Sequence, residues 1–317
     1  MAVAKTKCGR YIYAIWMTEK RRGECAVEER KRRFGDRRDG RRIRGLDPMH
    51  VFVPYLMPNR ADCEAFISEQ IDLTNMLQYL EKKNAAGLEN KYTFFHVIAA
   101  AMVRTLALRP RMNRFIAGRR VYERDRISIA FVAKKQFSDD GHESLLFLDF
   151  GKDATIDTVH NRIMEEVTSA RSGKIDNSTN FMGILGKLPR FLLSFVMWIL
   201  RTLDFYGKAP YFLVKEDPDF ASVFISNLGS IKLNAAYHHL NNWGTNSVFV
   251  VIGERHKAPV YSADGAAEIR DVLNIGITLD ERIADGYYYA KTVKLLKRLL
   301  QDPSLLERPI EELSEDE

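Results

Sequence analysis

The sequence predicts an α+β domain built around a sizeable β-sheet. Segments whose apolar residues recur at every second position alternate with segments of helical periodicity, and we find no internal repeat. At 317 residues the chain is long enough for one large domain or two small ones. Its hydrophobic fraction of 46% and charged fraction of 28% exclude a disordered chain and a disulfide-rich miniprotein.

Basic residues are concentrated at the start of the chain. Residues 1–46 hold 15 Lys and Arg against 6 Asp and Glu, whereas the rest of the chain holds 33 against 36. Such an arm can contact nucleic acid or anionic lipid, or it can be a solvated leader, with Met17 as a second candidate start. The basic residues are not interleaved with aromatic ones and no nucleic-acid-binding motif accompanies them, so we expect no nucleic-acid partner.

Cysteine usage and apolar runs bear on the compartment. Cys8, Cys25 and Cys63 are few and odd in number, which favours a reducing environment. No apolar stretch with a small-residue cleavage site follows the first basic residues. The apolar run from Phe191 to Leu200 is too short to span a bilayer. We therefore expect a cytoplasmic protein.

The first third of the chain alternates between strand and helix patterns. HVFVPYLMP, at residues 50–58, is expected to be an edge strand or a loop because it contains two prolines. Residues 64–73 alternate like a strand, and a short helix is expected over 75–83. Residues 93–108 are apolar nearly all round, which predicts a buried helix that Pro110 ends.

Paired strands follow from residue 118. GRRVYERDRISIAFVAKK and ESLLFLDFGK have period two and are separated by the polar turn SDDGH. Helical spacing returns over 156–170, and residues 172–187 read as a loop. A strongly apolar helix is expected near 188–206, with Pro189 in its first turn and Gly207 past its end.

The last third predicts the remaining core strands and a final helix. SVFISNLGS, SVFVVIGERHKAPV and EIRDVLNIGITLD read as strands, and the loop YHHLNNWGTN joins the first two. DGYYYAKTVKLLKRLLQDP reads as an amphipathic helix. The chain therefore divides into a basic, flexible arm at 1–46, a domain at 47–305 with an inserted apolar helix near 188–206, and an acidic tail at 306–317.

Three stretches, in order, resemble the catalytic domain of the 2-oxoacid dehydrogenase acyltransferases and the related chloramphenicol acetyltransferases. FISEQIDLTNMLQYLEKKN, followed by YTFFHVIAAAMVRTLALRPRMNRFIAGRRVYERDRISIAFVAKK, resembles the family's opening strand, helices and first hairpin. VFISNLG is similar to the family's F-T-I-S-N-L-G strand. DERIADG, at residues 280–286, is similar to the D-H-R-x-x-D-G signature. The resemblance covers roughly residues 50–303.

The resemblance implies a two-layer α/β sandwich of the chloramphenicol acetyltransferase type, with a mixed sheet, assembled as a homotrimer. The active site would lie at the subunit interface, reached by coenzyme A from one side and the acyl acceptor from the other. Ser226 matches the serine that donates a hydrogen bond to the tetrahedral oxyanion, with Asn227 beside it. Asp285 matches the aspartate that holds the signature loop by pairing with an arginine; Arg282 and Gly286 are also retained.

Glu281 stands where the family has its catalytic histidine. A neutral imidazole suits proton removal near pH 7, whereas a carboxylate does so only if burial raises its pKa. Three interpretations stay open. Glu281 is an altered base, it is a structural residue in a disabled site that pairs with an arginine, or it supports another base. His238 and His239 are the candidates for that other base, provided their loop folds over the channel.

Several features also have a purely structural interpretation. SNLGS can be a tight turn in which Asn227 and Gly229 supply unusual backbone angles. Cys63 has no accompanying base and reads as a filler residue. The helix at 188–205 can pack on the body or on a neighbouring subunit, cover the acyl channel, or, with the basic arm, contact a membrane surface. No His or Cys pair has metal-ligand spacing, so we expect no metal.

We therefore predict a trimeric, coenzyme-A-dependent acyltransferase with an altered base, which moves an acyl group from acyl-CoA to an unknown acceptor. No segment in the sequence resembles a lipoyl domain, so we expect no lipoyl group on this chain and no role as an ordinary core subunit. The alternative is a catalytically inactive trimeric binding or scaffold protein, peripheral to a membrane or not.

Overall fold

The structure is a computed structural model, and it describes residues 31–134, 143–171, 183, 185–262 and 264–313. The chain divides into two compact units, Met1–Phe34 and Gly35–Glu317. Every element below belongs to the second unit. The predicted turn SDDGH and most of the predicted loop at 172–187 lie outside the described residues.

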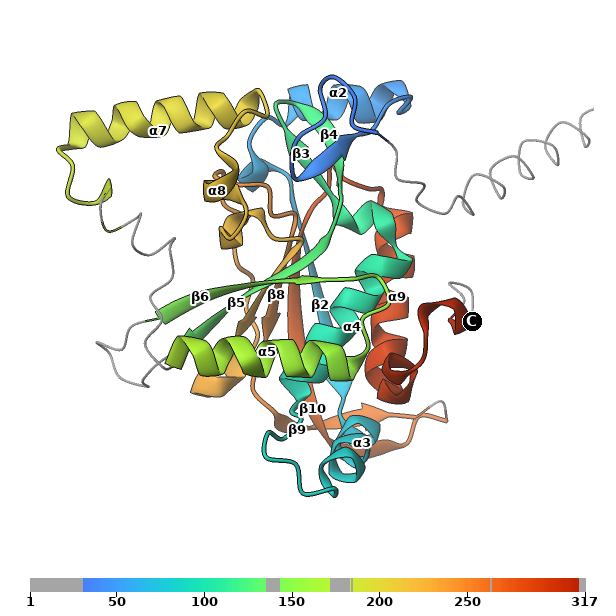
Figure 1. Cartoon of the computed structure of the whole chain (residues 1–317). Helices are drawn as coiled ribbons and strands as arrows, with labels where there is room; N and C mark the ends of the chain where they lie inside the picture. The colour runs from blue at the N-terminus through green and yellow to red at the C-terminus, as the bar shows by residue number, and fades with distance from the viewer. Residues whose placement is uncertain (1–30, 135–142, 172–182, 184, 263, 314–317) are drawn as a thin grey trace, which may run out of the picture. The chain divides into compact units, whose positions relative to one another are not determined.

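One mixed sheet organises the second unit (Figure 1). Its strands lie in the order β2-β10-β8-β7-β5-β6. β9 pairs with the first part of β10, from Ala267 to Val272. β7 runs parallel to both neighbours, and the other pairs are antiparallel. The strands are β2 (Glu64–Asp72), β5 (Ile127–Lys134), β6 (Glu143–Phe150), β7 (Val223–Asn227), β8 (Val248–Ile252), β9 (His256–Tyr261) and β10 (Ala267–Asp280).

Helices cover one face of this sheet and form the main core with it. Alternate residues of β7 and β8 show the two faces, because Ile225 and Val250 lie in the core with the helices, whereas Phe224 and Phe249 form a separate cluster with Leu240. The predicted two-layer α/β fold with a mixed sheet is therefore confirmed. The covering helices are α3 (Thr74–Asn84), α4 (Phe94–Leu108), α5 (Ile156–Arg171) and α9 (Gly286–Gln301).

α4 is buried along most of its length, as its composition predicts. Thr93 begins the helix and makes a reciprocal capping arrangement with His96, whose Nδ1 accepts from the Thr93 backbone N–H at 3.0 Å. His96 is therefore a hydrogen-bonded core residue at the start of a helix.

A second, three-stranded sheet shows that the body begins before residue 47. It consists of β1 (Gly40–Arg42), β4 (Arg120–Arg124) and β3 (Arg114–Ala117), in that order. The buried Arg37 donates to the carbonyl and the carboxylate of Asp204, each at 2.8 Å. The predicted end of the arm at residue 46 is thus too late. At the other end, Leu306 and Leu313 are buried, so the body also extends beyond residue 305.

Residues 48–56 form a helix, α2 (Pro48–Leu56), and the prediction of an edge strand or loop is wrong. The Asp47 carboxylate accepts from the Met49 backbone N–H and caps the helix, while Pro48 occupies the first turn, where its missing N–H costs nothing. Pro54 falls one turn from the end of this short helix, where it removes a single backbone hydrogen bond.

The predicted apolar helix is present as α7 (Arg190–Phe205), and a short helix, α8 (Tyr211–Val214), follows it. Pro189 precedes α7. Gly207, with φ of +69°, lets the chain turn away, and the backbone N–H of Lys208 bonds to the carbonyl of Leu203 at 2.7 Å. In the described part of the chain, no helix has the length and apolar character needed to cross a membrane.

Candidate active site

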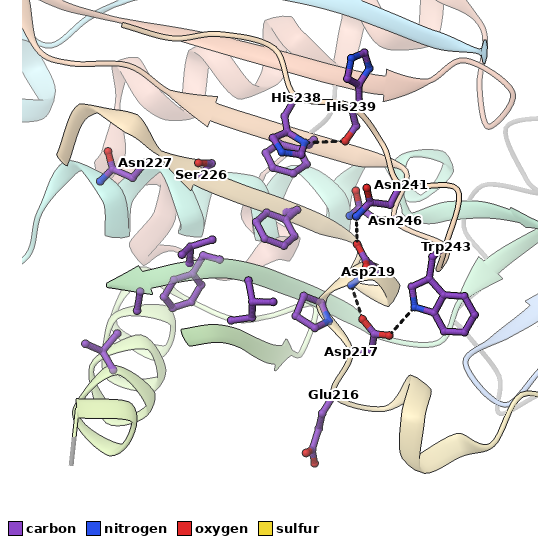
Figure 2. A pocket seen from close by; sticks show the side chains of 18 of the residues that line it. Glu216, Asp217, Asp219, Ser226, Asn227, His238, His239, Asn241, Trp243 and Asn246 are labelled. Atoms are coloured by element: carbon purple, nitrogen blue, oxygen red, sulfur yellow. Dashed lines mark hydrogen bonds between the residues drawn. The ribbon is translucent and has the colours of Figure 1, made fainter. Parts of the chain in front are cut away.

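A large cavity, of about 1380 Å³, lies at the carboxyl ends of the parallel strands β5 and β7. Helices α5 and α7 contribute apolar side chains to its lining. The loops after α8 and β7 contribute polar ones, which Figure 2 labels. The apolar part includes Phe131, Ile163, Met164, Leu193, Met197, Leu200 and Phe212, and the polar part includes Asp217, Asp219, Ser226, Asn227, His238, Asn241 and Asn246.

Ser226 reaches the cavity because of its place in β7. Val223 and Ile225 point into the helical core, so Phe224 and Ser226 point to the opposite face. Within the described residues, the Ser226 side chain has no hydrogen-bond partner, so its hydroxyl is available to a ligand. The amide oxygen of Asn227 is buried and also lacks a partner there, and Figure 2 shows it beside Ser226.

The turn after Ser226 depends on close packing. Asn227 and Gly229 both have negative φ, so the prediction that they supply unusual backbone angles is wrong. A Cβ on Gly229 would lie 2.5 Å from the carbonyl oxygen of Gly253, so this position needs glycine for the close approach of two backbones. The left-handed residue of the turn is Lys232, at φ 60°.

His238 lies in the same cavity as Ser226 and is held there on an aromatic stack. Its ring lies 4.1 Å from that of Phe249 with an interplanar angle of 6°, and Phe249 stacks on Phe224 at 4.8 Å. Its Nδ1 lies 2.8 Å from the backbone carbonyl of His239. A carbonyl only accepts, so Nδ1 carries the proton, and in the neutral ring Nε2 is then a proton acceptor.

His239 also lines the cavity, but its ring points away from that of His238 in Figure 2. Its Nδ1 lies 2.9 Å from a carboxylate oxygen of Glu64, which also accepts from the backbone N–H of Leu240. Because the Glu64 side chain is buried, these contacts fasten the loop to the start of β2. His239 therefore positions the loop that carries His238.

Three acidic residues that the sequence did not identify line the cavity: Glu216, Asp217 and Asp219. Asp217 accepts from the indole N–H of Trp243 at 2.9 Å, and Asp219 accepts from the side-chain amide of Asn241 at 2.7 Å. Burial raises the pKa of Asp219 above its ordinary value, against the opposing effect of the Asn241 hydrogen bond. The polar run LNNWGTN was the only signal for this cluster.

The signature loop, residues 280–286, contributes no residue to the lining of this cavity. Arg282 is buried and makes a bidentate ion pair with Asp280, with both N–O distances at 2.8 Å. Asp285 caps α9 by accepting from the backbone N–H of Tyr288 at 2.9 Å, and its approach to Arg111 is only 3.7 Å. Asp285 is thus paired with an arginine, Arg111, as the resemblance implies, while the arginine of the signature, Arg282, pairs with Asp280.

Glu281 is exposed and is not among the residues that line the cavity. Its backbone N–H bonds to the carbonyl of Cys63 at 2.9 Å, and within the described residues its side chain forms no ion pair. The predicted arginine partner of Glu281 is therefore not found in the described chain. Burial raises the pKa of the Cys63 thiol to about 12, which leaves it inert, as expected.

Strand register separates Glu281 from Ser226. Ser226 pairs with Val251 of β8, and Val251 pairs with Gly276 of β10, which runs the opposite way. Glu281 lies five positions beyond Gly276, so at about 3.3 Å per residue and about 4.8 Å per strand it is roughly 20 Å from Ser226. One chain does not bring these two residues together.

Comparison with known proteins supports the resemblance. Residues 213–307 match the family described as 2-oxoacid dehydrogenases acyltransferase (catalytic domain). This segment contains Ser226, His238 and the signature loop. No curated protein matches the chain in sequence.

Solved structures show that the similarity in fold covers more than four fifths of the chain. A probable dihydrolipoamide acetyltransferase from Listeria monocytogenes has a TM-score of 0.55 at 15% identity, covering 82% of this chain and 94% of that one. A dihydrolipoamide acetyltransferase from Azotobacter vinelandii has 0.55 at 17%, covering 84% and 94%. A 2-oxoacid dehydrogenase complex core from Thermoplasma acidophilum has 0.52 at 15%, covering 82% and 98%. The predicted resemblance to this family, and its fold, are thus confirmed.

Proposed function

We propose that this protein is a coenzyme-A-dependent acyltransferase that holds its acyl group in the cavity beside Ser226. The single observation that carries the proposal is that Ser226 and His238 line the same large, mostly apolar cavity. The resemblance of residues 213–307 to an acyltransferase catalytic domain supports the reaction class.

The lining of the cavity favours an acyl group with an extended apolar chain. Leu193, Met197 and Leu200 of α7 and Ile163 and Met164 of α5 all contribute apolar side chains to the lining. No described lining residue is Lys or Arg. The phosphates of coenzyme A therefore have no cation inside the cavity, which fits the acyl chain and thioester rather than the nucleotide.

The chemistry that this site can supply is general base catalysis with oxyanion stabilisation. The acceptor's hydroxyl or thiol attacks the thioester carbonyl, and its proton passes to Nε2 of His238. The Ser226 hydroxyl donates a hydrogen bond to the oxyanion of the tetrahedral intermediate. When the C–S bond breaks, the coenzyme A thiolate takes the proton from the imidazolium, which restores the neutral ring.

Glu281 is the second candidate base. At roughly 20 Å, on the strand spacing used above, it reaches Ser226 only from a neighbouring copy of the chain. The homotrimer that the resemblance implies, with sites at its interfaces, would allow this. A catalytically inactive scaffold of the same fold remains the alternative function, because an intact cavity alone performs no chemistry.

Coenzyme A release tests the proposal. Thiol release is measured with acetyl-, octanoyl- and dodecanoyl-CoA and a mixture of thiol and alcohol acceptors. We expect the longer chains to be preferred, and the His238→Asn and Ser226→Ala variants each to lose about 10²-fold or more in kcat. His256→Asn is the matched control, because His256 also has Nδ1 near a backbone carbonyl, that of Glu254, but lies on β9. Acyl-CoA binding without turnover in a wide acceptor panel would instead support the scaffold.

A further inference from the structure

Two helices at the same end of the unit present apolar faces to solvent (Figure 1). On α7 the exposed fractions of Phe191, Phe195 and Trp198 are 78%, 56% and 61%. On α2 the side chains of Phe52 and Tyr55 are more than half exposed, with Met49 and Leu56 beside them. We call these residues of α2 and α7, with Phe205, the apolar platform. Soluble proteins rarely expose a contiguous apolar surface of this kind without a partner for it.

The turn between β3 and β4 contacts both helices of the platform. A Cβ on Gly118 of this turn would lie 2.1 Å from the carbonyl oxygen of Phe205, at the end of α7. The guanidinium of the next residue, Arg119, lies 5.3 Å from the ring centre of Tyr55 on α2. Arg37 adds an ion pair to Asp204 on α7 at 2.8 Å. Both helices are therefore fixed on the same small sheet.

Cationic side chains border the platform. Lys187, Arg190, Arg201 and Lys208 lie on α7 or directly beside it, and all four are exposed. None of the four forms an ion pair within the described residues. The one acidic residue between positions 185 and 208 is Asp204, and Arg37 already pairs with it. The charge that remains free along α7 is therefore positive.

The apolar side chains and the cationic border together indicate which kind of partner binds the platform. A second copy docked face to face would bring two cationic borders together, which is unfavourable. With 16 residues, α7 has the broad apolar face, the Trp and Phe side chains and the flanking Lys and Arg of a helix that lies in a membrane interface. We infer that the apolar platform docks the protein on an anionic lipid bilayer.

The side of α7 that does not belong to the platform lines the cavity. Leu193, Met197 and Leu200 line the cavity, whereas Phe195 and Trp198 lie on the platform. A docked protein would therefore hold its cavity one helix away from the bilayer. This consequence rests on the proposed function, but the docking itself does not.

Co-sedimentation of the full chain with vesicles tests the docking. We expect binding to vesicles of phosphatidylcholine with one quarter phosphatidylglycerol, weaker binding to phosphatidylcholine alone, and loss with rising salt. The Phe195→Glu/Trp198→Glu variant should bind at least tenfold more weakly. Tyr261→Glu/Ile269→Glu is the matched control, since these apolar residues are 71% and 67% exposed but lie on β9 and β10 at the opposite end (Figure 1).

Charge reversal gives a second, independent variant. Arg190→Glu/Arg201→Glu should lose most binding to the anionic vesicles, whereas Lys91→Glu/Lys257→Glu, at exposed sites away from the platform, should not. Circular dichroism confirms that each variant folds. Turnover of a soluble acyl-CoA by the Phe195→Glu/Trp198→Glu variant should match the natural protein, which separates failure of docking from failure of the proposed function.

Three outcomes would overturn the inference. The first is no vesicle binding by the natural protein. The second is equal loss of binding in the platform and control variants. The third is an oligomer in solution that the Phe195→Glu/Trp198→Glu substitution breaks apart, since the platform would then be an interface between copies.

Discussion

Ser226 and Glu281 lie at opposite ends of the sheet within one chain. β7, which carries Ser226, runs parallel to β8, and β10, which leads into Glu281, runs antiparallel to it. The two residues that correspond to the family's oxyanion donor and base are therefore separated by roughly 20 Å, at about 3.3 Å per residue along a strand. His238 lines the same cavity as Ser226.

Mixed assemblies test whether Ser226 and His238 act from the same chain. Ser226→Ala and His238→Asn chains carrying different tags are co-expressed, and assemblies containing both tags are purified. Because both residues belong to one cavity, we expect no recovery of turnover above that of the separate variants. Recovery to a substantial fraction of natural activity would mean that the two residues meet across a subunit boundary.

The same experiment with Glu281 discriminates between the two candidate bases. If His238 is the base, Glu281→Gln retains most of the natural kcat. If instead Glu281→Gln is inactive, and its co-assembly with Ser226→Ala restores turnover, Glu281 of a neighbouring copy is the base. That pair of results would reverse the assignment proposed for His238.

The glycine after Ser226 gives a prediction about stability and activity. Gly229→Ala should destabilise the protein by about 1–3 kcal/mol, since the new Cβ would lie 2.5 Å from the carbonyl oxygen of Gly253. It should also lower turnover, because the turn that follows Ser226 must shift. Gly151→Ala is the control, as no atom lies within 4 Å of the Cβ there and its φ is not positive. Urea denaturation and thiol release measure the two effects.

The buried ion pair of the signature loop should be a large stability determinant. Arg282→Ala leaves the fully buried Asp280 carboxylate with only the more distant Arg60, at 3.7 Å, which should cost about 3 kcal/mol. Arg255→Ala, which removes an exposed pair with Asp271, should cost about 1 kcal/mol or less. Equal midpoints of urea denaturation for the two variants would contradict this prediction.

His96 should make stability fall in mild acid. Burial, together with the nearby His160, lowers the pKa of His96 to about 4 in the folded chain. Between the unfolded value, about 6.5, and about 4, the unfolded chain binds more protons, so stability decreases as pH falls through this window. The loss should approach about 2 kcal/mol at pH 5. His96→Gln should remove that part of the difference between urea denaturation at pH 7 and at pH 5, and an unchanged difference would refute the assignment.

The fold was largely predictable because its elements have clear periodicity and caps. The alternation at 64–73 and the apolar run at 93–108 specify β2 and α4 directly. One exception was α2, because the two prolines at residues 54 and 58 indicated an extended segment and the capping signal of Asp47 followed by Pro48 was missed. A short helix with proline at its start has the composition of an extended segment, and only the cap distinguishes them.

The site was predictable only in part. The motif identified Ser226, and the paired histidines were proposed as candidates, but nothing in the sequence distinguishes His238 from His239. Their different roles come from Glu64, which is far away in sequence and anchors His239. The separation of Glu281 from Ser226 depends on strand register, which the motif does not encode.

Thiol release from dodecanoyl-CoA by the natural protein and its His238→Asn, Glu281→Gln and His256→Asn variants tests the central claim most directly. The proposed site predicts turnover that falls about 10²-fold or more in His238→Asn and stays near the natural value in the other two. Natural-level turnover in His238→Asn would contradict it.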